Sequence, residues 1–361
     1  MGSRIVHDHT ESNSTQIVPV AGKLSALAVR LETAPGGSAY WDFTLLVNGV
    51  ASAMTVRISG ASTTGSYSGA AISVSALDRV CVLIEPTSSP TACTCSFTML
   101  WMPDTEGHYI IMGNGVSNNT YRNTLACGRA ANTQDYRSGV LIPVAGTAGN
   151  FGVVLVNAPG AGYTATQVVR VNGASPAGTP TVAIADANTS GTDGVNTAAI
   201  AAGNYVGTLA TLTAGGTAGN SYQSCRLAPT TSGLFPVGMN IGYSVQLTTG
   251  STTYASPMQA APAFSATIDE VQQRCAAGTL KSFYVRFHDG TNPGGVGKQY
   301  TLTVYKNGFA TGLAVTISGT DTSGNVSSDV SVSEGDVLAI CIEPSGTPNA
   351  VRCIWGIAMT G

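Results

Sequence analysis

The chain has 361 residues, enough for two or three domains of ordinary size. Only 10% of its residues are charged and 44 are glycine, a composition typical of turn-rich β proteins rather than helical ones. The net charge of −3 provides no basic surface for nucleic acid, and no apolar run is long enough to span a bilayer. We therefore expect no nucleic-acid partner and no membrane insertion.

The first nine residues contain no apolar segment of the kind found in secretory signal peptides. This predicts a soluble protein that is made in a cytoplasm. An extracellular destination is the alternative, and it would need release by cell lysis or an unusual export route.

One sequence motif, which we call the opening phrase, recurs along the chain. It begins with Ala-Gly and continues with alternating apolar residues. Its copies lie at residues 20–31, 144–155 and 277–287. Self-similarity of this kind indicates tandem units. We predict three, with the second the most divergent, at residues 1–104, 105–236 and 237–361.

Short segments after each phrase alternate apolar and polar residues and end in Gly, Pro or Asn-Gly, which predicts strands with one buried face. In units one and three, residues 40–49 correspond to 299–308, and residues 80–86 correspond to 338–344. Regularly spaced short strands without a helical period predict an all-β fold: three tandem antiparallel β-sandwiches, jelly-roll-like.

Asn-Gly pairs stand at the same place in every unit, beginning at Asn48, Asn172 and Asn307. A tight two-residue hairpin turn needs positive φ at both central residues, and Asn and Gly adopt it at little cost. The sequence therefore predicts one shared hairpin per unit.

A further strand is expected ahead of the phrase in units two and three, whereas unit one has little room before Gly22, so its strand is short or absent. A sheet edge without a partner is a template for another chain. The residues predicted to form assembly strands are Tyr109, Ile110, Ile111, Tyr243, Val245 and Leu247.

The chain has eight cysteines. Cys341 and Cys353 flank a turn symmetrically, so on a regular hairpin they would lie within disulfide distance. Buried free thiols are the alternative, because the matching pair in unit one is Leu83 and Cys95. Residues 93–95 lack the second half of a zinc site, so no zinc is expected.

Asp186 and Asp321 stand at polar turns and are the residues that a calcium site would use. The carboxylate expected at the twelfth position of a calcium loop starting at Asp186 is missing, since Thr197 stands there. The matching turn of unit one, residues 61–65, has no acid at all. A polar turn is the favoured interpretation, and no cofactor is predicted.

No catalytic residue is predicted. Glu85 and Glu343 occupy the same position in different units, so they should not face each other across one substrate as glycosidase carboxylates do. Trp41, Trp101 and Trp355 could offer aromatic faces for glycan stacking. Trp355 aligns with Phe97 and Trp41 with Tyr300, and such aromatic-to-aromatic exchange favours a role in cores or in the seams between units.

Part of the third unit reads Ala-Gly-Thr-Leu-x-x-Phe-x-Val-Arg, then Tyr-Thr-Leu-Thr-Val-x-x-Asn-Gly, and later Pro-Ser-Gly-Thr-Pro. This phrase, within residues 278–348 and less closely within 22–90, resembles a repeat in structural proteins of tailed phages and related environmental sequences. The resemblance implies a virion surface or decoration protein and supplies no catalytic residue.

These observations predict a non-enzymatic structural protein of a virion, either a capsid decoration protein or a component of the head or tail surface, made in the host cytoplasm. Its strand edges and seams would bind a second copy, giving a homo-oligomer, and a capsid or tail protein lattice. The alternatives are a carbohydrate-binding adhesin with a surface glycan as partner, and an extracellular filament whose subunits exchange a strand.

Overall fold

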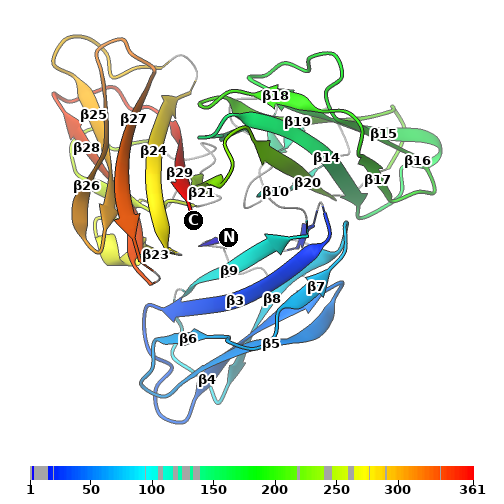
Figure 1. The fold of residues 1–361 in the computed structure, drawn as a ribbon, viewed down its shortest axis with the longest axis horizontal. Helices are drawn as coiled ribbons and strands as arrows, with labels where there is room; N and C mark the ends of the chain where they lie inside the picture. The colour runs from blue at the N-terminus through cyan, green and yellow to red at the C-terminus, as the bar shows by residue number, and fades with distance from the viewer. Residues whose placement is uncertain are drawn as a thin grey trace.

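The computed structural model places strands almost throughout and confirms the all-β prediction (Figure 1). The residues that it describes are 2–3, 15–18, 20–93, 95–104, 109–116, 121–123, 131–132, 139–217, 220–239, 246–258, 264–275, 277–288, 291–333 and 335–361. Within them, six antiparallel sheets pair into three sandwiches, each around its own core. The only helical turn in these ranges is η1 (Ile268–Glu270), and no described helix could cross a bilayer.

Unit one packs two sheets face to face. The first has the order β1 (Gly2–Ser3), β9 (Cys95–Pro103), β3 (Gly22–Leu31) and β6 (Thr64–Ser66), with β7 (Ile72–Val74) also beside β3. The second has the order β2 (Gln16–Ile17), β8 (Arg79–Thr87), β4 (Tyr40–Val47) and β5 (Val50–Ser59).

Unit two repeats this arrangement. Its first sheet has the order β10 (Tyr109–Val116), β20 (Asn220–Pro229), β14 (Gly146–Leu155) and β17 (Ser190–Asp193), with β18 (Ala198–Ile200) also beside β14. Its second has the order β12 (Ala131–Asn132), β11 (Tyr121–Asn123), β19 (Tyr205–Leu212), β15 (Gly160–Val171) and β16 (Thr181–Asp186), with β13 (Val140–Leu141) also beside β19.

Unit three follows the same plan. Its first sheet has the order β21 (Leu234–Met239), β29 (Cys353–Thr360), β24 (Gly278–Phe287) and β27 (Ser323–Val332). Its second has the order β22 (Thr253–Ala255), β28 (Val337–Ser345), β25 (Gln299–Lys306) and β26 (Phe309–Ser318), with β23 (Gln273–Arg274) also beside β28.

In every unit the first strand pairs with the last, and the opening phrase forms the strand on the other side of the last one. The second sheet contains the remaining strands, so consecutive strands near the end of a unit alternate between sheets. This order is that of a jelly roll, as the sequence predicts. In unit one the first strand, β1, has only two residues.

The glycine that opens each phrase lies where the backbone of the last strand passes unusually close. A Cβ atom on Gly22, Gly146 or Gly278 would come within 2.5, 2.3 and 2.3 Å of a carbonyl oxygen of that neighbouring strand. No real Cβ atom tolerates such a distance, and a backbone oxygen cannot swing aside. The repeated Ala-Gly therefore marks a place where two neighbouring strands approach so closely that only glycine fits.

The predicted Asn-Gly turns are confirmed in all three units. Asn48, Asn172 and Asn307 have φ of 53°, 51° and 51°, and the glycines that follow them have φ of 80°, 77° and 83°. Both central residues of each turn are thus left-handed, as the tight hairpin requires.

Unit two differs from its neighbours in the middle of its core. Five residues before the Asn of the Asn-Gly turn, units one and three have Phe43 and Leu302, but unit two has Gln167. Gln167 is 1% exposed, and neither its amide oxygen nor its amide nitrogen has a hydrogen-bond partner. Nearby, the buried Thr208 donates to Gln223, which donates to Ser221. The core of unit two is therefore partly polar and incompletely satisfied.

Replacing Gln167 with leucine is expected to raise the free energy of unfolding by about 1–3 kcal/mol, because it removes two unsatisfied buried polar atoms and restores the residue of unit three. Urea unfolding measures the change. Gln223→Leu is the matched control and should act in the opposite direction, since it removes the acceptor of the Thr208 bond and the donor of the Ser221 bond from a buried network. A loss of stability in Gln167→Leu would contradict this account.

Asp193, which is 9% exposed, anchors a loop of the same unit. It accepts hydrogen bonds from the backbone amides of Thr181, Val195 and Asn196 at 2.8, 3.1 and 3.0 Å, and from the side-chain amide of Asn196 at 2.9 Å. Burial alone would raise the pKa of this carboxyl, but the hydrogen bonds outweigh it and lower the pKa to about 2.

Because the folded pKa of Asp193 is depressed, its contribution to stability is complete above about pH 4 and is lost as the pH falls towards 2. Acid unfolding of the protein followed by circular dichroism should therefore include a component from this carboxyl. In Asp193→Asn that component should be missing, and the stability difference between the two proteins should shrink on acidification. A difference that stays constant with pH would refute the assignment.

Candidate functional site

The three sandwiches form a ring, with both chain ends near its centre (Figure 1). The candidate functional sites are the seams between units, because equivalent elements make all three. In each seam a short strand just ahead of the opening phrase, β2, β13 or β23, lies against the first sheet of the next unit. Unit one thus contacts unit two, unit two contacts unit three, and unit three contacts unit one, which closes the ring.

Each seam strand is held by the turn that leads into β8, β19 or β28 of its own unit. In unit one the amide of Val18 donates to the carbonyl of Asp78 at 2.9 Å, and the amide of Leu77 donates to the carbonyl of Val18 at 2.6 Å. The equivalent backbone bonds join Ile142 to Gly203 and Asn204, and Cys275 to Gly335 and Asp336. The seam element is therefore built in the same way three times.

The Asn-Gly hairpin fixes the same turn from the other side. The Asn307 side-chain amide donates to Oδ1 of Asp336 at 2.7 Å, and its oxygen accepts from the amide of Val337 at 2.9 Å. Asp336 also accepts from the amide of Ser333 at 2.8 Å. These contacts, the bond to the Ser333 amide first, lower the pKa of Asp336. Asn48, Asp78, Arg79 and Ser75 make the same set of bonds in unit one.

The seam from unit one to unit two is apolar and tightly packed. Ile17 and Val18 are fully buried, and β2 lies against β10, β14 and β20. A Cβ atom on Gly152 would come within 2.7 Å of the Leu77 side chain, so this glycine makes room for Leu77 from the neighbouring unit. Leu77 itself has φ of 68°, where units two and three have glycine. The leucine is thus held in a costly conformation by the seam that it fills.

The seam from unit two to unit three has the same character. Leu141 and Ile142 are buried, and β13 lies against β24 and β29. A Cβ atom on Gly356 would come within 2.7 Å of the Leu141 carbonyl oxygen, so a glycine again admits the neighbour. The guanidinium of Arg286 lies 5.2 Å from the ring centre of Tyr205 across this seam, a favourable cation–π contact.

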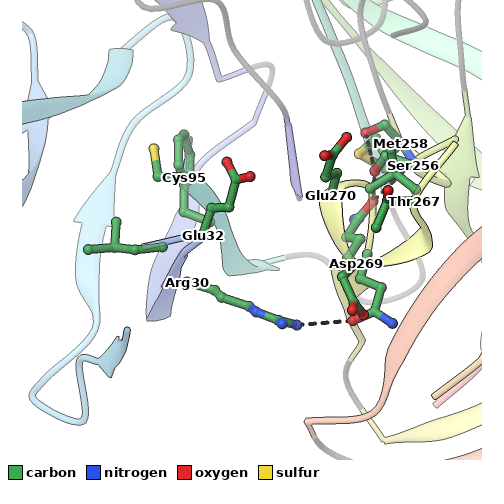
Figure 2. Close-up of a pocket in the computed structure, with 13 residues that line it drawn as sticks. Arg30, Glu32, Cys95, Ser256, Met258, Thr267, Asp269 and Glu270 are labelled. Atoms are coloured by element: carbon green, nitrogen blue, oxygen red, sulfur yellow. Dashed lines mark hydrogen bonds between the residues drawn. The ribbon is translucent and has the colours of Figure 1, made fainter. Parts of the chain in front are cut away.

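The seam from unit three to unit one is polar by comparison. Gln272, Gln273 and Cys275 are only half-buried, and Arg30 donates to the Gln272 side chain at 3.1 Å. This seam also contains a half-open pocket of about 230 Å³. Figure 2 shows Arg30 reaching from unit one towards the segment that holds Asp269 and Glu270. The other polar residues that line this pocket include Glu32, Ser256 and Thr267.

The predicted assembly strands have mostly internal partners. Tyr109, Ile110 and Ile111 lie in β10, which pairs with β20 of its own unit. Leu247 is 1% exposed and belongs to the core of unit three, while Tyr243 and Val245 lie outside the described residues. The counterpart of β10 in unit three is β21, which begins nine residues before the predicted segment that starts at Tyr243.

The hairpin that a Cys341–Cys353 disulfide would require does not form. Cys341 lies in β28 and Cys353 in β29, and these strands belong to opposite sheets of the sandwich. Both are buried free thiols, and burial raises the pKa of each. They correspond to the alternative interpretation of the sequence, that of thiols packed in the protein interior.

The two aspartates considered for calcium are both exposed, Asp186 at the end of β16 and Asp321 after a turn. Asp186 has φ of 58° and accepts a hydrogen bond from the amide of Gly162 at 2.7 Å, so it holds the irregular start of β15 against the end of β16. Asp321 donates its backbone amide to the carbonyl of Ser318 within a turn. Across the described ranges, no group of three or more His, Cys, Asp or Glu side chains is placed to hold a metal ion.

The tryptophans lie in cores rather than on a binding platform. Trp355 is 0% exposed and donates its indole N–H to the carbonyl of Pro257 at 2.8 Å, so it cannot stack on a glycan. Trp41 and Trp101 are half-buried against the core of unit one, with their indole nitrogens enclosed. The glycan-stacking interpretation is therefore wrong for Trp355, and the other two are mainly packing residues.

No protein-family model matches this chain, and no curated protein matches it. The resemblance to structural proteins of tailed phages accordingly stays a prediction from the sequence.

Proposed function

We propose that this protein is a non-enzymatic structural component of a virion surface, which sits as a ring of three like sandwiches on a threefold position of a capsid or tail lattice. The observation that carries the proposal is the ring itself, in which equivalent strands make every seam. Units related by rotation about one axis present equivalent loops on the same side of the ring. Such a surface fits three equivalent neighbours around a threefold axis.

Exposed apolar side chains at equivalent places support a docking role. Val50 and Phe309 each follow an Asn-Gly turn, in units one and three, and are 69% and 78% exposed. Ala174 stands at the same position in unit two. A solvent-exposed phenylalanine on a hairpin tip is unfavourable in water, so a partner that covers these tips would gain apolar contact with each unit.

The test is co-sedimentation of the purified chain with emptied heads and tails of tailed phages, followed by electron cryo-microscopy of the saturated particles. We expect saturation at one chain per threefold position, with density for one three-lobed ring. The double variant Val50→Asp/Phe309→Asp should bind at least tenfold more weakly, a loss of about 1.4 kcal/mol or more. Val195→Asp, on another loop and 89% exposed in the parent, is the matched control and should bind normally.

Occupancy that ignores the threefold positions would contradict the proposal, and so would equal binding by the double variant and the parent. Binding to an array of glycans in place of phage particles would favour the adhesin alternative. Because Trp355 is buried, that alternative would need aromatic residues other than this one.

A further inference from the structure

The ring has one seam unlike the other two. In the first two seams the short strand contributes fully buried aliphatic side chains, Ile17 and Val18 in one, Leu141 and Ile142 in the other. In the third seam the corresponding residues are Arg274 and Cys275, and Cys275, the one whose burial is described, is half-buried. The short strand of the third seam therefore buries less aliphatic surface than the strands of the other two seams, although the buried Val271 and Met258 also line this seam.

The third seam is also incompletely packed and poorly balanced in charge. It contains a half-open pocket of about 230 Å³, so the two units do not pack against each other along the whole seam. Three carboxylates line this pocket, Glu32, Asp269 and Glu270, against the single guanidinium of Arg30. Arg30 makes its hydrogen bond across the seam to the neutral side chain of Gln272, not to one of these acids.

Chain connectivity sets the third seam apart as well. Units one and two are joined directly after β9, and units two and three by the short segment between β20 and β21. The first two seams thus join consecutive units, whereas the third joins the two ends of the chain. If it opens, the chain stays in one piece and uncovers two complementary surfaces, the β9 side of unit one and the β23 side of unit three.

We propose that the third seam opens in the folded protein and that two copies exchange it, so that unit three of each copy docks on unit one of the other in a closed ring of six units. This inference concerns the partner surface for a second copy and does not depend on a viral lattice. Because the two surfaces are different and complementary, the same contacts that close one ring also join two chains. The exchanged form therefore gains with protein concentration and keeps the contacts of the third seam, while the first two seams must open wider to fit six units in one ring.

Opening can be measured with Cys95, which lines the pocket of the third seam. A thiol reagent is added to the full-length protein in native buffer, and mass spectrometry of peptides gives the labelling rate of each cysteine. In Arg30→Glu the labelling of Cys95 should be about tenfold faster than in the parent, because a hydrogen bond to a charged group is lost and a fourth acid is added to the pocket. Cys225, buried in the core of unit two, should be unaffected and reports global unfolding.

The repeat supplies a matched control. Arg286 is the counterpart of Arg30 in unit three, and it lies over Tyr205 across the apolar second seam. Arg286→Glu should leave the labelling of Cys95 unchanged. Equal acceleration by both variants, or no acceleration by either, would overturn the idea that the third seam opens selectively.

Exchange is tested by mixing two copies that bear different fluorescent labels at high concentration, followed by light scattering on a sizing column. We expect a species of twice the monomer mass that carries both labels, formed severalfold faster in Arg30→Glu than in Arg286→Glu. Monomer alone at every concentration would overturn the proposal.

A permuted chain gives an independent test. It begins at Leu234, runs to Gly361, continues through a copy of residues 230–238 to Gly2, and ends at Pro229, so that the third seam is now tethered and the second is not. This chain should remain monomeric at concentrations where the parent forms mixed dimers. Dimers of the permuted chain in the same amount would show that the exchanged seam is a different one.

Discussion

Replacing Trp355 with alanine is expected to lower the free energy of unfolding of unit three by about 3–5 kcal/mol. This indole is the largest fully buried side chain in the described residues, with 0% exposure. It lies in β29 opposite Val285 of β24, and its N–H is bonded to the carbonyl of Pro257. Truncation therefore empties a large volume in the core and leaves that carbonyl without its donor.

Urea unfolding followed by far-ultraviolet circular dichroism measures this loss, with the midpoint for unit three moving to lower urea. Trp41→Ala is the control, since the half-buried Trp41 lies at the edge of the core of unit one and should cost clearly less. The two variants, Trp355→Ala and Trp41→Ala, also decide between the roles considered for these residues, which are packing in cores and glycan stacking. A Trp355→Ala protein of unchanged stability would mean that the indole does not hold the core together.

Replacing Gly146 with alanine is expected to destabilise the protein by about 1–3 kcal/mol or more, although it adds a single methyl group. The new Cβ atom would lie 2.3 Å from the carbonyl oxygen of Ala228 and 2.9 Å from the Cα atom of Pro229. Both are backbone atoms of β20, so the strands must separate at the start of the opening phrase. Hydrogen bonds between β14 and β20 would weaken with them.

Thermal unfolding monitored by calorimetry is the measurement, and Gly250→Ala provides a control. A Cβ atom on Gly250 meets nothing within 4 Å, so its substitution should change the midpoint little or raise it slightly. The equivalent substitutions Gly22→Ala and Gly278→Ala should resemble Gly146→Ala. An unchanged unfolding midpoint in Gly146→Ala would mean that the repeated glycine has some role other than allowing the close approach of the two strands.

The architecture within each unit could be predicted because local signals determine it. Alternating apolar residues in the opening phrase place Leu27, Phe151 and Phe283 in the cores, where all three are fully buried. The Asn-Gly turns carry their own conformational preference and need no distant partner.

The first strand of unit three was harder to place because its pattern is interrupted. β21 contains Pro236 and Gly238, and its pairing with β29 shifts register between them. A proline and a glycine inside a strand are typical of a loop, and a bulge breaks the alternation of buried and exposed residues. The apolar residues 243–247 gave a cleaner signal, so the prediction was placed on them and not on β21.

The interpretation of Cys341 and Cys353 depended on an assumption about topology. Two strands joined by a short turn usually form a hairpin, but in a jelly roll the last two strands belong to opposite sheets. Spacing along the chain could not reveal this, because the pairing of β28 with β25 and of β29 with β24 is set by contacts distant in sequence.

Seams between units were expected, but the residues that form them were not predicted, although the sequence contains a signal for them. Ahead of the Ala-Gly phrase, unit one reads Ile-Val-Pro-Val and unit two reads Leu-Ile-Pro-Val, while unit three reads Arg-Cys-Ala. Aliphatic residues at the outer edge of a unit, repeated twice and then replaced by polar ones, indicate two apolar contacts and one polar contact. Which surface they cover is a property of the assembled ring and does not appear in any local pattern.

Fusing the three units into one chain changes what a mutation can do. In a ring of three identical subunits every substitution appears three times, so a polar residue in the core would weaken all three at once. In this chain Gln167, Thr208 and Gln223 appear once each, and the sandwiches around Phe43 and Leu302 keep hydrocarbon interiors. A cost confined to one unit is easier to tolerate, which explains how the middle sandwich could diverge while the ring kept its shape.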